Sequence, residues 1–237
     1  MADATVELFA TNTGTLGVLT VVVPLTGYVW TPGDILAGLA WAGEANLSAP
    51  TGPSGWTVDF SEHIRDPPTT DLHAWHAAWH TVPETTITEV VFGNPEQEGD
   101  SVRCAVVVFR NGDIDGYTIG SSHAALANFP GTETVSAPSV AGTTGALVTT
   151  HVAYRQVNTD NPTWHGPPTG MTVLLDEPAT RVPVYASKEL AVVPPTGTRT
   201  VTIDQGALQD IYYFSGISIL VPSFSRTGWH VGMVRGN

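Results

Sequence analysis

Basic residues are scarce in this 237-residue chain: it has 9 lysines and arginines against 22 aspartates and glutamates, and Lys188 is its only lysine. The formal net charge is therefore −13. Nucleic-acid backbones and anionic membranes are usually bound through clustered lysine and arginine. We therefore expect no nucleic-acid partner and no membrane insertion. The apolar runs are also far shorter than the roughly 20 residues of a membrane-spanning helix.

Cysteine is almost absent, because Cys104 is the only one. An intrachain disulfide is therefore excluded. Cys104 lies in the apolar run SVRCAVVVF, which predicts that it is a small buried hydrophobic residue. The first ten residues, MADATVELFA, lack the basic and apolar regions of a secretory signal. We therefore expect synthesis in a cytoplasm without a signal peptide.

Helical patterns are also rare. Short runs of valine, isoleucine, threonine and aromatic residues alternate with turns, which contain many of the 24 glycines and 18 prolines. This pattern predicts an all-β sandwich or barrel. One segment, residues 69–82, fits a helix or a strand. A helix would bring His73, His76 and His80 near one face, as zinc ligands require, whereas a strand would separate His76 and His80 by roughly 13 Å and turn His73 away.

An internal repeat resolves this ambiguity. Residues 53–58 (PSGWTV) recur as residues 168–173 (PTGMTV), and four further matches follow the same order with similar offsets. The repeat defines halves of about 5–111 and 115–222. It sets the ambiguous histidine segment opposite residues 184–194, whose pattern is that of a strand, and it gives Trp56 and Met171 equivalent packing positions. We therefore predict a strand there and no metal site formed by its three histidines.

The repeat also predicts the architecture. Each half alone would leave wide apolar sheet faces exposed, and pairing the two halves would bury them. We predict an all-β, jelly-roll-type antiparallel β-sandwich formed by two pseudo-symmetric halves. It would be one domain of residues 1–222 with a single core, followed by a C-terminal arm of residues 223–237.

Catalytic chemistry has little support in the sequence. Ser121, Ser122, His123 and Ser215 do not lie in a G-x-S-x-G nucleophile motif. Most acidic residues fall in predicted turns, where they usually serve solubility. This group comprises Asp59, Glu62, Asp66, Asp113, Asp115, Asp176 and Glu177. We therefore expect no enzyme, no catalytic residue, no cofactor and no bound metal.

Two segments could contact partners. The arm carries arginines and no acidic residue, so it could dock on a neighbouring acidic subunit, or it could pack on its own chain. Its candidate docking residues are Arg226, Trp229, Met233 and Arg235. Trp164 and His165 lie in the predicted loop NPTWHGPP. They are the candidates for surface recognition, for example of a host-cell glycan.

The layout of residues 5–221 resembles a class of tailed-bacteriophage virion proteins, usually labelled minor tail or structural proteins, with concanavalin- or jelly-roll-like sandwiches. The segments that carry the resemblance are 33–36 (GDIL), 53–56 (PSGW), 83–84 (PE), 106–111 (VVVFRN), 137–140 (APSV), 145–148 (GALV), 167–171 (PPTGM) and 197–199 (GTR). The histidines of residues 73–80 and the tail after Pro222 depart from the pattern of that class.

The resemblance implies a non-enzymatic structural protein of the virion, in particular a minor tail protein of the tail tip or baseplate. The alternatives are a capsid decoration protein and a carbohydrate-binding module for receptor recognition. The expected partners are other tail or capsid subunits and further copies of the chain, because virion assemblies are symmetric. The family supplies no catalytic residue.

Overall fold

The computed structural model describes residues 3–14, 19–44, 49–65, 73–93, 102–125, 131–155, 162–178, 181–204 and 211–224. These ranges contain β-strands and one 3₁₀ turn, η1 (Ile114–Gly116), but no α-helix. No helix within them has the length and apolar character that crossing a membrane requires. The prediction of an all-β antiparallel sandwich is confirmed, while its jelly-roll detail and the domain limits stay predictions.

The strands follow the two halves that the repeat predicts. The described part of the first half contains β1 (Thr5–Thr13), β2 (Thr20–Pro24), β3 (Ile35–Glu44), β4 (Thr57–Arg65), β5 (His73–Thr81), β6 (Glu89–Gly93) and β7 (Val102–Arg110). That of the second half contains β8 (Thr118–Ala125), β9 (Thr132–Ala137), β10 (Gly145–Arg155), β11 (Thr163–His165), β12 (Thr172–Glu177), β13 (Val184–Val192), β14 (Arg199–Asp204) and β15 (Ile211–Pro222).

The two halves share one strand order. The large sheet of the first half has the order β1-β7-β3-β5-β4, and that of the second has β8-β15-β10-β13-β12. The small sheets are β2-β6 and β9-β14-β11. In the first half, an isolated bridge joins Thr51 to Gly93 at the end of β6. It occupies the position that the pairing of β11 with β14 occupies in the second half. The duplication read from the sequence is therefore a duplication of topology.

The best-matched repeat segment forms the same turn twice. In one half Trp56 N–H donates to the Pro53 carbonyl, and in the other Met171 N–H donates to the Pro168 carbonyl. Gly55 and Gly170 have φ values of 82° and 83°, which a type II turn requires at its third position and which glycine adopts without strain. Trp56 and Met171 then pack on the outer faces of their large sheets.

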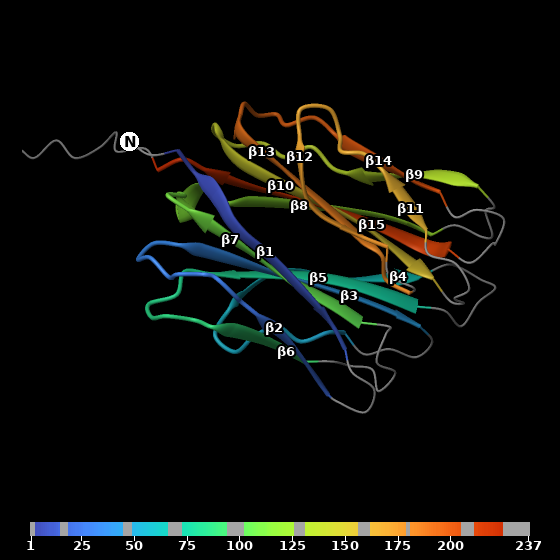
Figure 1. The fold of residues 1–237 in the computed structure, drawn as a ribbon, viewed down its shortest axis with the longest axis horizontal. Helices are drawn as coiled ribbons and strands as arrows, with labels where there is room; N and C mark the ends of the chain where they lie inside the picture. The colour runs from blue at the N-terminus through green and yellow to red at the C-terminus, as the bar shows by residue number, and fades with distance from the viewer. Residues whose placement is uncertain are drawn as a thin grey trace, which may run out of the picture.

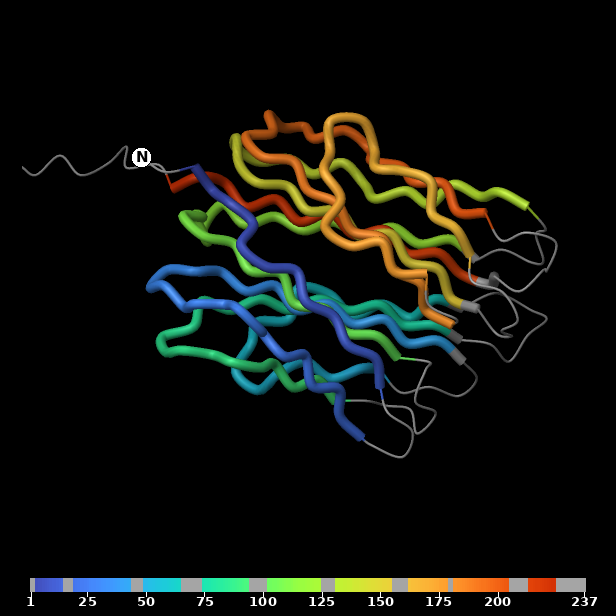
Figure 2. The backbone as a smooth tube through the Cα atoms, viewed as in Figure 1, coloured from blue at the N-terminus to red at the C-terminus, as the bar shows by residue number. Residues whose placement is uncertain are grey.

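The four sheets stack in layers, with the two large sheets in the middle and one small sheet on each outer face (Figure 1). Figure 2 shows the two halves as separate colour blocks, blue to green below and green to red above. The largest core lies between the large sheets and includes Trp41, Phe109, Val148 and Ile217. Because the central strands are covered on both faces, β7 is apolar almost throughout.

Some details differ from the sequence predictions. The chain has separate cores under the small sheets as well as the central core, because each half covers its own outer face. Residues 73–81 form β5, as predicted. Cys104 is fully buried, as expected, and burial raises the pKa of its thiol. The first two residues of the predicted arm contact the body, since Ser223 accepts a hydrogen bond from Ala4 N–H and Phe224 N–H donates to the Asn111 carbonyl.

Candidate functional site

The central interface carries polar side chains at both of its edges. They belong to two rows of cross-strand neighbours, one in each large sheet, that face each other. The first row consists of Glu62, His76, Trp41, Arg103 and Thr13. The second consists of Glu177, Val184, Val152, Ser215 and His123. Apolar residues fill the middle, so the polar groups gather where β4 meets β8 and where β7 meets β12.

His76 lies at the centre of the first polar edge. Its side chain is fully buried, and each ring nitrogen has a partner. Nε2 lies 2.5 Å from Glu62 Oε2, and Nδ1 lies 2.7 Å from Ser215 Oγ in the opposite sheet. Ser121 Oγ donates to the same Glu62 oxygen at 3.0 Å. Strands β4 and β5 of one half are thereby joined to β8 and β15 of the other.

His123 completes this cluster from β8. Its Nδ1 lies 3.7 Å from Glu62 Oε2, and its ring meets the His76 ring edge-on at a centroid distance of 5.3 Å. The side chains of Glu62 and His123 are 40% and 42% exposed. One donor atom each from Glu62, His76 and His123 lies within 4.8 Å of the others. The cluster is therefore buried at His76 and open to solvent at its rim.

Burial sets the charge state of His76, and hydrogen bonds set that of Glu62. It lowers the pKa of His76 to about 4, against the opposing effect of the Glu62 carboxylate. Burial also acts to raise the pKa of Glu62, but the hydrogen bonds from His76 and Ser121 outweigh it, and that pKa is lowered. At neutral pH the cluster therefore holds a neutral His76 imidazole and an ionised Glu62 carboxylate.

A second polar group lies further along β4 and β5. His80 Nδ1 is 2.7 Å from Asp59 Oδ1, and the Tyr117 hydroxyl donates to Asp59 Oδ2 at 3.0 Å. The Tyr117 and His80 rings are 4.6 Å apart. Burial, and then the Asp59 charge, raise the pKa of Tyr117 well above its usual value. This phenol therefore stays a hydrogen-bond donor, and the group fastens the segment between the halves to β4.

The opposite edge pairs a carboxylate with an arginine. The Arg103 side chain, 4% exposed, forms an ion pair with Glu177, which also accepts a hydrogen bond from Thr11 Oγ1 at 3.2 Å. Glu62 and Glu177 occupy equivalent places, since Glu62 pairs across its sheet with His76 on β5 and Glu177 pairs with Val184 on β13. Both were predicted to lie in turns. That prediction is wrong: they lie on β4 and β12 and face the interface.

The chain of contacts from Ser215 through His76 to Glu62 has the connectivity of a nucleophile, a base and an orienting acid. However, Ser215 is 1% exposed and lies between two packed sheets, so a substrate carbonyl cannot reach its hydroxyl. Two imidazoles and one carboxylate are a donor set suited to a divalent transition metal. Coordination is therefore the chemistry that this geometry favours.

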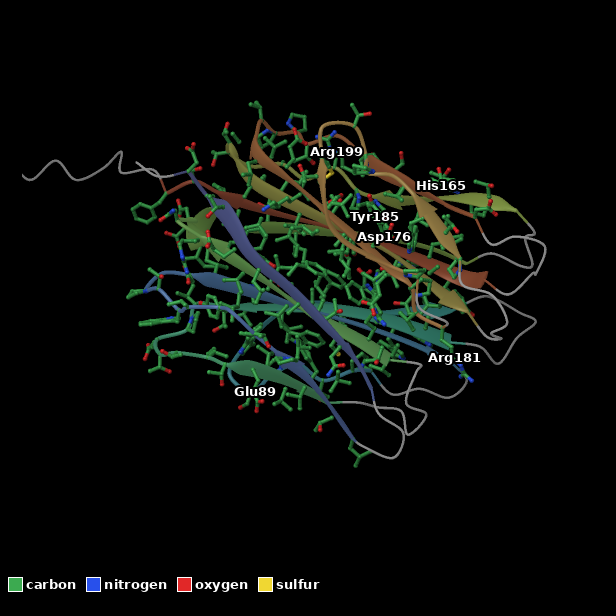
Figure 3. The ribbon with its side chains drawn as sticks, viewed as in Figure 1. Glu89, His165, Asp176, Arg181, Tyr185 and Arg199 are labelled. Atoms are coloured by element: carbon green, nitrogen blue, oxygen red, sulfur yellow. The ribbon has the colours of Figure 1, made fainter. Side chains whose placement is uncertain are left out.

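The residues singled out from the sequence have different outcomes. Trp164 is not on a loop: it lies on β11, is 5% exposed and packs with Tyr185 and Phe214 under the outer sheet. It therefore offers no exposed face for stacking on a sugar. His165 is exposed in the same outer layer (Figure 3). The predicted docking residues Arg226, Trp229, Met233 and Arg235 lie outside the described residues.

The histidine segment was interpreted correctly in part. His76 and His80 point to the same side of β5, as the strand prediction required, and they contact different acids. The His76 side chain is fully buried. The sequence interpretation missed the partnership of His76 with Glu62, Ser215 and His123. The one available signal was the repeat, which makes Glu62 and Glu177 equivalent.

A cleft of about 640 Å³ opens at the end of the sandwich where the described chain finishes. Phe224 and Val82 line it and are 53% and 39% exposed. Two of its four charged residues are paired, because Arg110 donates to both carboxylate oxygens of Asp34, at 3.0 and 3.1 Å, and the other two are Asp113 and Asp115. Phe224, the last described residue, therefore lies at the edge of a partly apolar cleft.

No protein-family model matches the chain, and no curated protein is similar to it in sequence.

Proposed function

We propose that the chain is a non-enzymatic structural protein of a bacteriophage virion, and specifically a minor tail protein of the tail tip or baseplate. The observation that carries this proposal is the way in which the halves are joined. An apolar core lies between them, and the polar side chains at both of its edges pair across it. Such a stack is suited to serve as a stiff building block, and the sequence layout resembles that of tail proteins.

The acidic composition and the C-terminal segment extend the proposal to assembly. Residues 1–224 carry all 22 acidic residues, whereas residues 225–237 carry two arginines and no acid. This segment would bind the acidic surface of a neighbouring subunit through Arg226, Trp229, Met233 and Arg235. The partners would be other virion proteins and further copies of the chain, after synthesis in the host cytoplasm.

The test is to locate the chain on particles. Virions of the phage that encodes it are purified on a density gradient, analysed by mass spectrometry and labelled with a gold-conjugated antibody to the chain. We expect the chain in the particles, with gold at the distal tail. Labelling over the capsid would favour a decoration protein instead. A chain present in the lysate but absent from purified particles would refute a virion role.

The docking role of the arm has a separate test. A chain that ends at Phe224 keeps the hydrogen bonds of Ser223 and Phe224 to the body and should therefore melt like the full chain. We expect it to fold but not to enter particles. A full-length variant with Arg226→Ser and Arg235→Ser should show the same defect without the deletion. Normal incorporation of both variants would contradict the docking role.

The glycan-binding alternative would need a stacking surface other than Trp164, which is buried. A glycan array probed with the purified full-length chain tests it. Specific binding to cell-surface glycans would add receptor recognition to the structural role, and its absence would leave the structural role alone.

A further inference from the structure

The donor atoms of Glu62, His76 and His123 have the spacing of ligands around one ion. Zinc binds nitrogen and oxygen ligands at about 2.0–2.1 Å, so two neighbours in a tetrahedral site lie roughly 3.3 Å apart. Here Glu62 Oε2 lies 2.5 Å from His76 Nε2 and 3.7 Å from His123 Nδ1. These distances bracket the required value. The three donor atoms, one from each residue, all lie within 4.8 Å of one another.

The contact between His123 and Glu62 is explained better by coordination than by direct bonding. At 3.7 Å, Nδ1 of His123 is too far from Glu62 Oε2 for a hydrogen bond. The His76 and His123 rings meet edge-on. The His123 imidazole therefore approaches the Glu62 carboxylate without forming a hydrogen bond to it. A bound cation between them would use both groups.

Two serines support these ligands. A metal-binding histidine usually forms a hydrogen bond through its other ring nitrogen, which fixes its orientation. Ser215 Oγ occupies that position on His76, at 2.7 Å from Nδ1, and leaves Nε2 to face Glu62. Ser121 donates to the carboxylate at 3.0 Å. Both serines come from the second half, so they hold ligands supplied by the first.

We propose that Glu62, His76 and His123 bind one divalent transition-metal ion, with zinc as the best match, and that water fills the fourth position on the exposed side. Two nitrogen ligands and one carboxylate oxygen suit zinc better than calcium or magnesium, which prefer oxygen ligands. The ion joins β4 and β5 of the first half to β8 of the second. It is a cross-link between the duplicated halves, independent of where the chain works in a particle.

Direct titration of the full-length chain tests the site. The protein is treated with EDTA, dialysed, and titrated with Zn²⁺ in a calorimeter and with Co²⁺ under visible spectroscopy. We expect one ion per chain and the intense absorption of four-coordinate Co²⁺. At a zinc concentration 100 times the Kd, the unfolding equilibrium constant should fall about 100-fold if the unfolded chain does not bind, which raises the Tm.

The test variants replace Glu62 and His123, because these are the exposed ligands and the fold tolerates their replacement most easily. Glu62→Gln and His123→Gln should each abolish the Co²⁺ signal and the zinc-dependent rise in Tm. Ser215→Ala should weaken binding about 10- to 100-fold through the orientation of His76. His165→Gln is the matched control, because this exposed histidine lies in the outer layer on β11, and it should bind like the parent chain.

Two results would overturn the proposal. One is the absence of stoichiometric binding to the folded parent chain. The other is equal binding by the parent and His123→Gln, which would assign the ion to other histidines. Loss of binding in His165→Gln with retention in Glu62→Gln would have the same meaning. Circular dichroism of each apo variant at the titration temperature ensures that a lost signal reports the site and not unfolding.

Discussion

His151 provides a direct test of the charge states inside the second half. Its side chain is fully buried on β10, Nε2 lies 3.1 Å from the Arg199 carbonyl oxygen, and the Tyr185 ring stands edge-on at 6.5 Å. Among the described residues, its Nδ1 has no hydrogen-bond partner. Protonation at Nδ1 would therefore place an unpaired charge between the large sheet and the outer sheet. Burial accordingly lowers the pKa of His151 to about 4, against the opposing effect of the bond to the Arg199 carbonyl.

The sign of the pH effect follows from this shift. Between about pH 4 and pH 6.5 the unfolded chain binds a proton at His151 and the folded chain does not, so the free energy of unfolding falls as the pH falls. Each unit of pKa difference corresponds to about 1.4 kcal/mol. The full shift from 6.5 to about 4 therefore amounts to a loss of about 3 kcal/mol, all of it below pH 6.5.

His151→Gln isolates this contribution from that of the other groups. The glutamine amide can still donate to the Arg199 carbonyl, but it does not titrate. Urea denaturation at intervals from pH 7.5 to pH 4.5 gives the free energy of unfolding for both chains. We expect the parent to lose about 2–3 kcal/mol more than the variant across this range. His165→Gln, at an exposed position, should follow the parent. Parallel pH profiles for the parent and His151→Gln would refute the buried, neutral imidazole.

Two further predictions concern the joints between the sheets. Glu177→Ala removes the carboxylate that faces the buried Arg103 guanidinium. It should lower the free energy of unfolding, measured by urea denaturation, by about 3 kcal/mol. This is the lower end of the range for breaking a buried ion pair, because Glu177 is partly exposed. The double variant Arg103→Met with Glu177→Leu should recover most of that loss. If Glu177→Ala lowers the free energy of unfolding by less than about 1 kcal/mol, the buried Arg103 guanidinium does not depend on this ion pair. Gly216→Ala would place a Cβ 1.9 Å from the Ser136 carbonyl oxygen and should lower the free energy of unfolding by more than about 2 kcal/mol, since backbone must shift. Gly120→Ala meets only side-chain atoms, at 3.0 Å or more, and is the milder control; equal effects of the two glycine variants would contradict the close approach of β15 to β9.

The features that the sequence predicts best are those fixed by local chemistry and repeated twice. Gly55 and Gly170 have to stand in a turn with positive φ, so the same four-residue pattern marks the same turn in both halves. The strand assignment of residues 73–81 follows from the second copy, which is followed by a proline-rich turn and is most naturally a strand. A repeated turn and its flanking strands are enough to predict a duplicated all-β chain.

The cluster around His76 could not be predicted in this way, because its members are distant in the sequence. Ser215 is 139 residues from His76, and their contact depends on how the two large sheets stack. A strand shifted by one residue would turn its side chains to the opposite face. Trp164 illustrates the same limit. Its neighbours in the sequence are typical of a loop, yet pairing of β11 with β14 turns its indole into the core.

The two equivalent glutamates offer an independent argument for a cation at the histidine edge. Arg103 neutralises Glu177 at one end of the interface. At the other end, no described arginine or lysine side chain pairs with Glu62, and its closest partner, His76, is neutral at pH 7 because burial lowers its pKa. The same place in the fold is thus paired with an arginine in one half and with two histidines, His76 and His123, in the other. A divalent ion held by Glu62, His76 and His123 would supply at the histidine edge the positive charge that Arg103 supplies at the other. On this reasoning, Glu62→Gln should stabilise the metal-free chain or leave it unchanged and should destabilise only the zinc-loaded one.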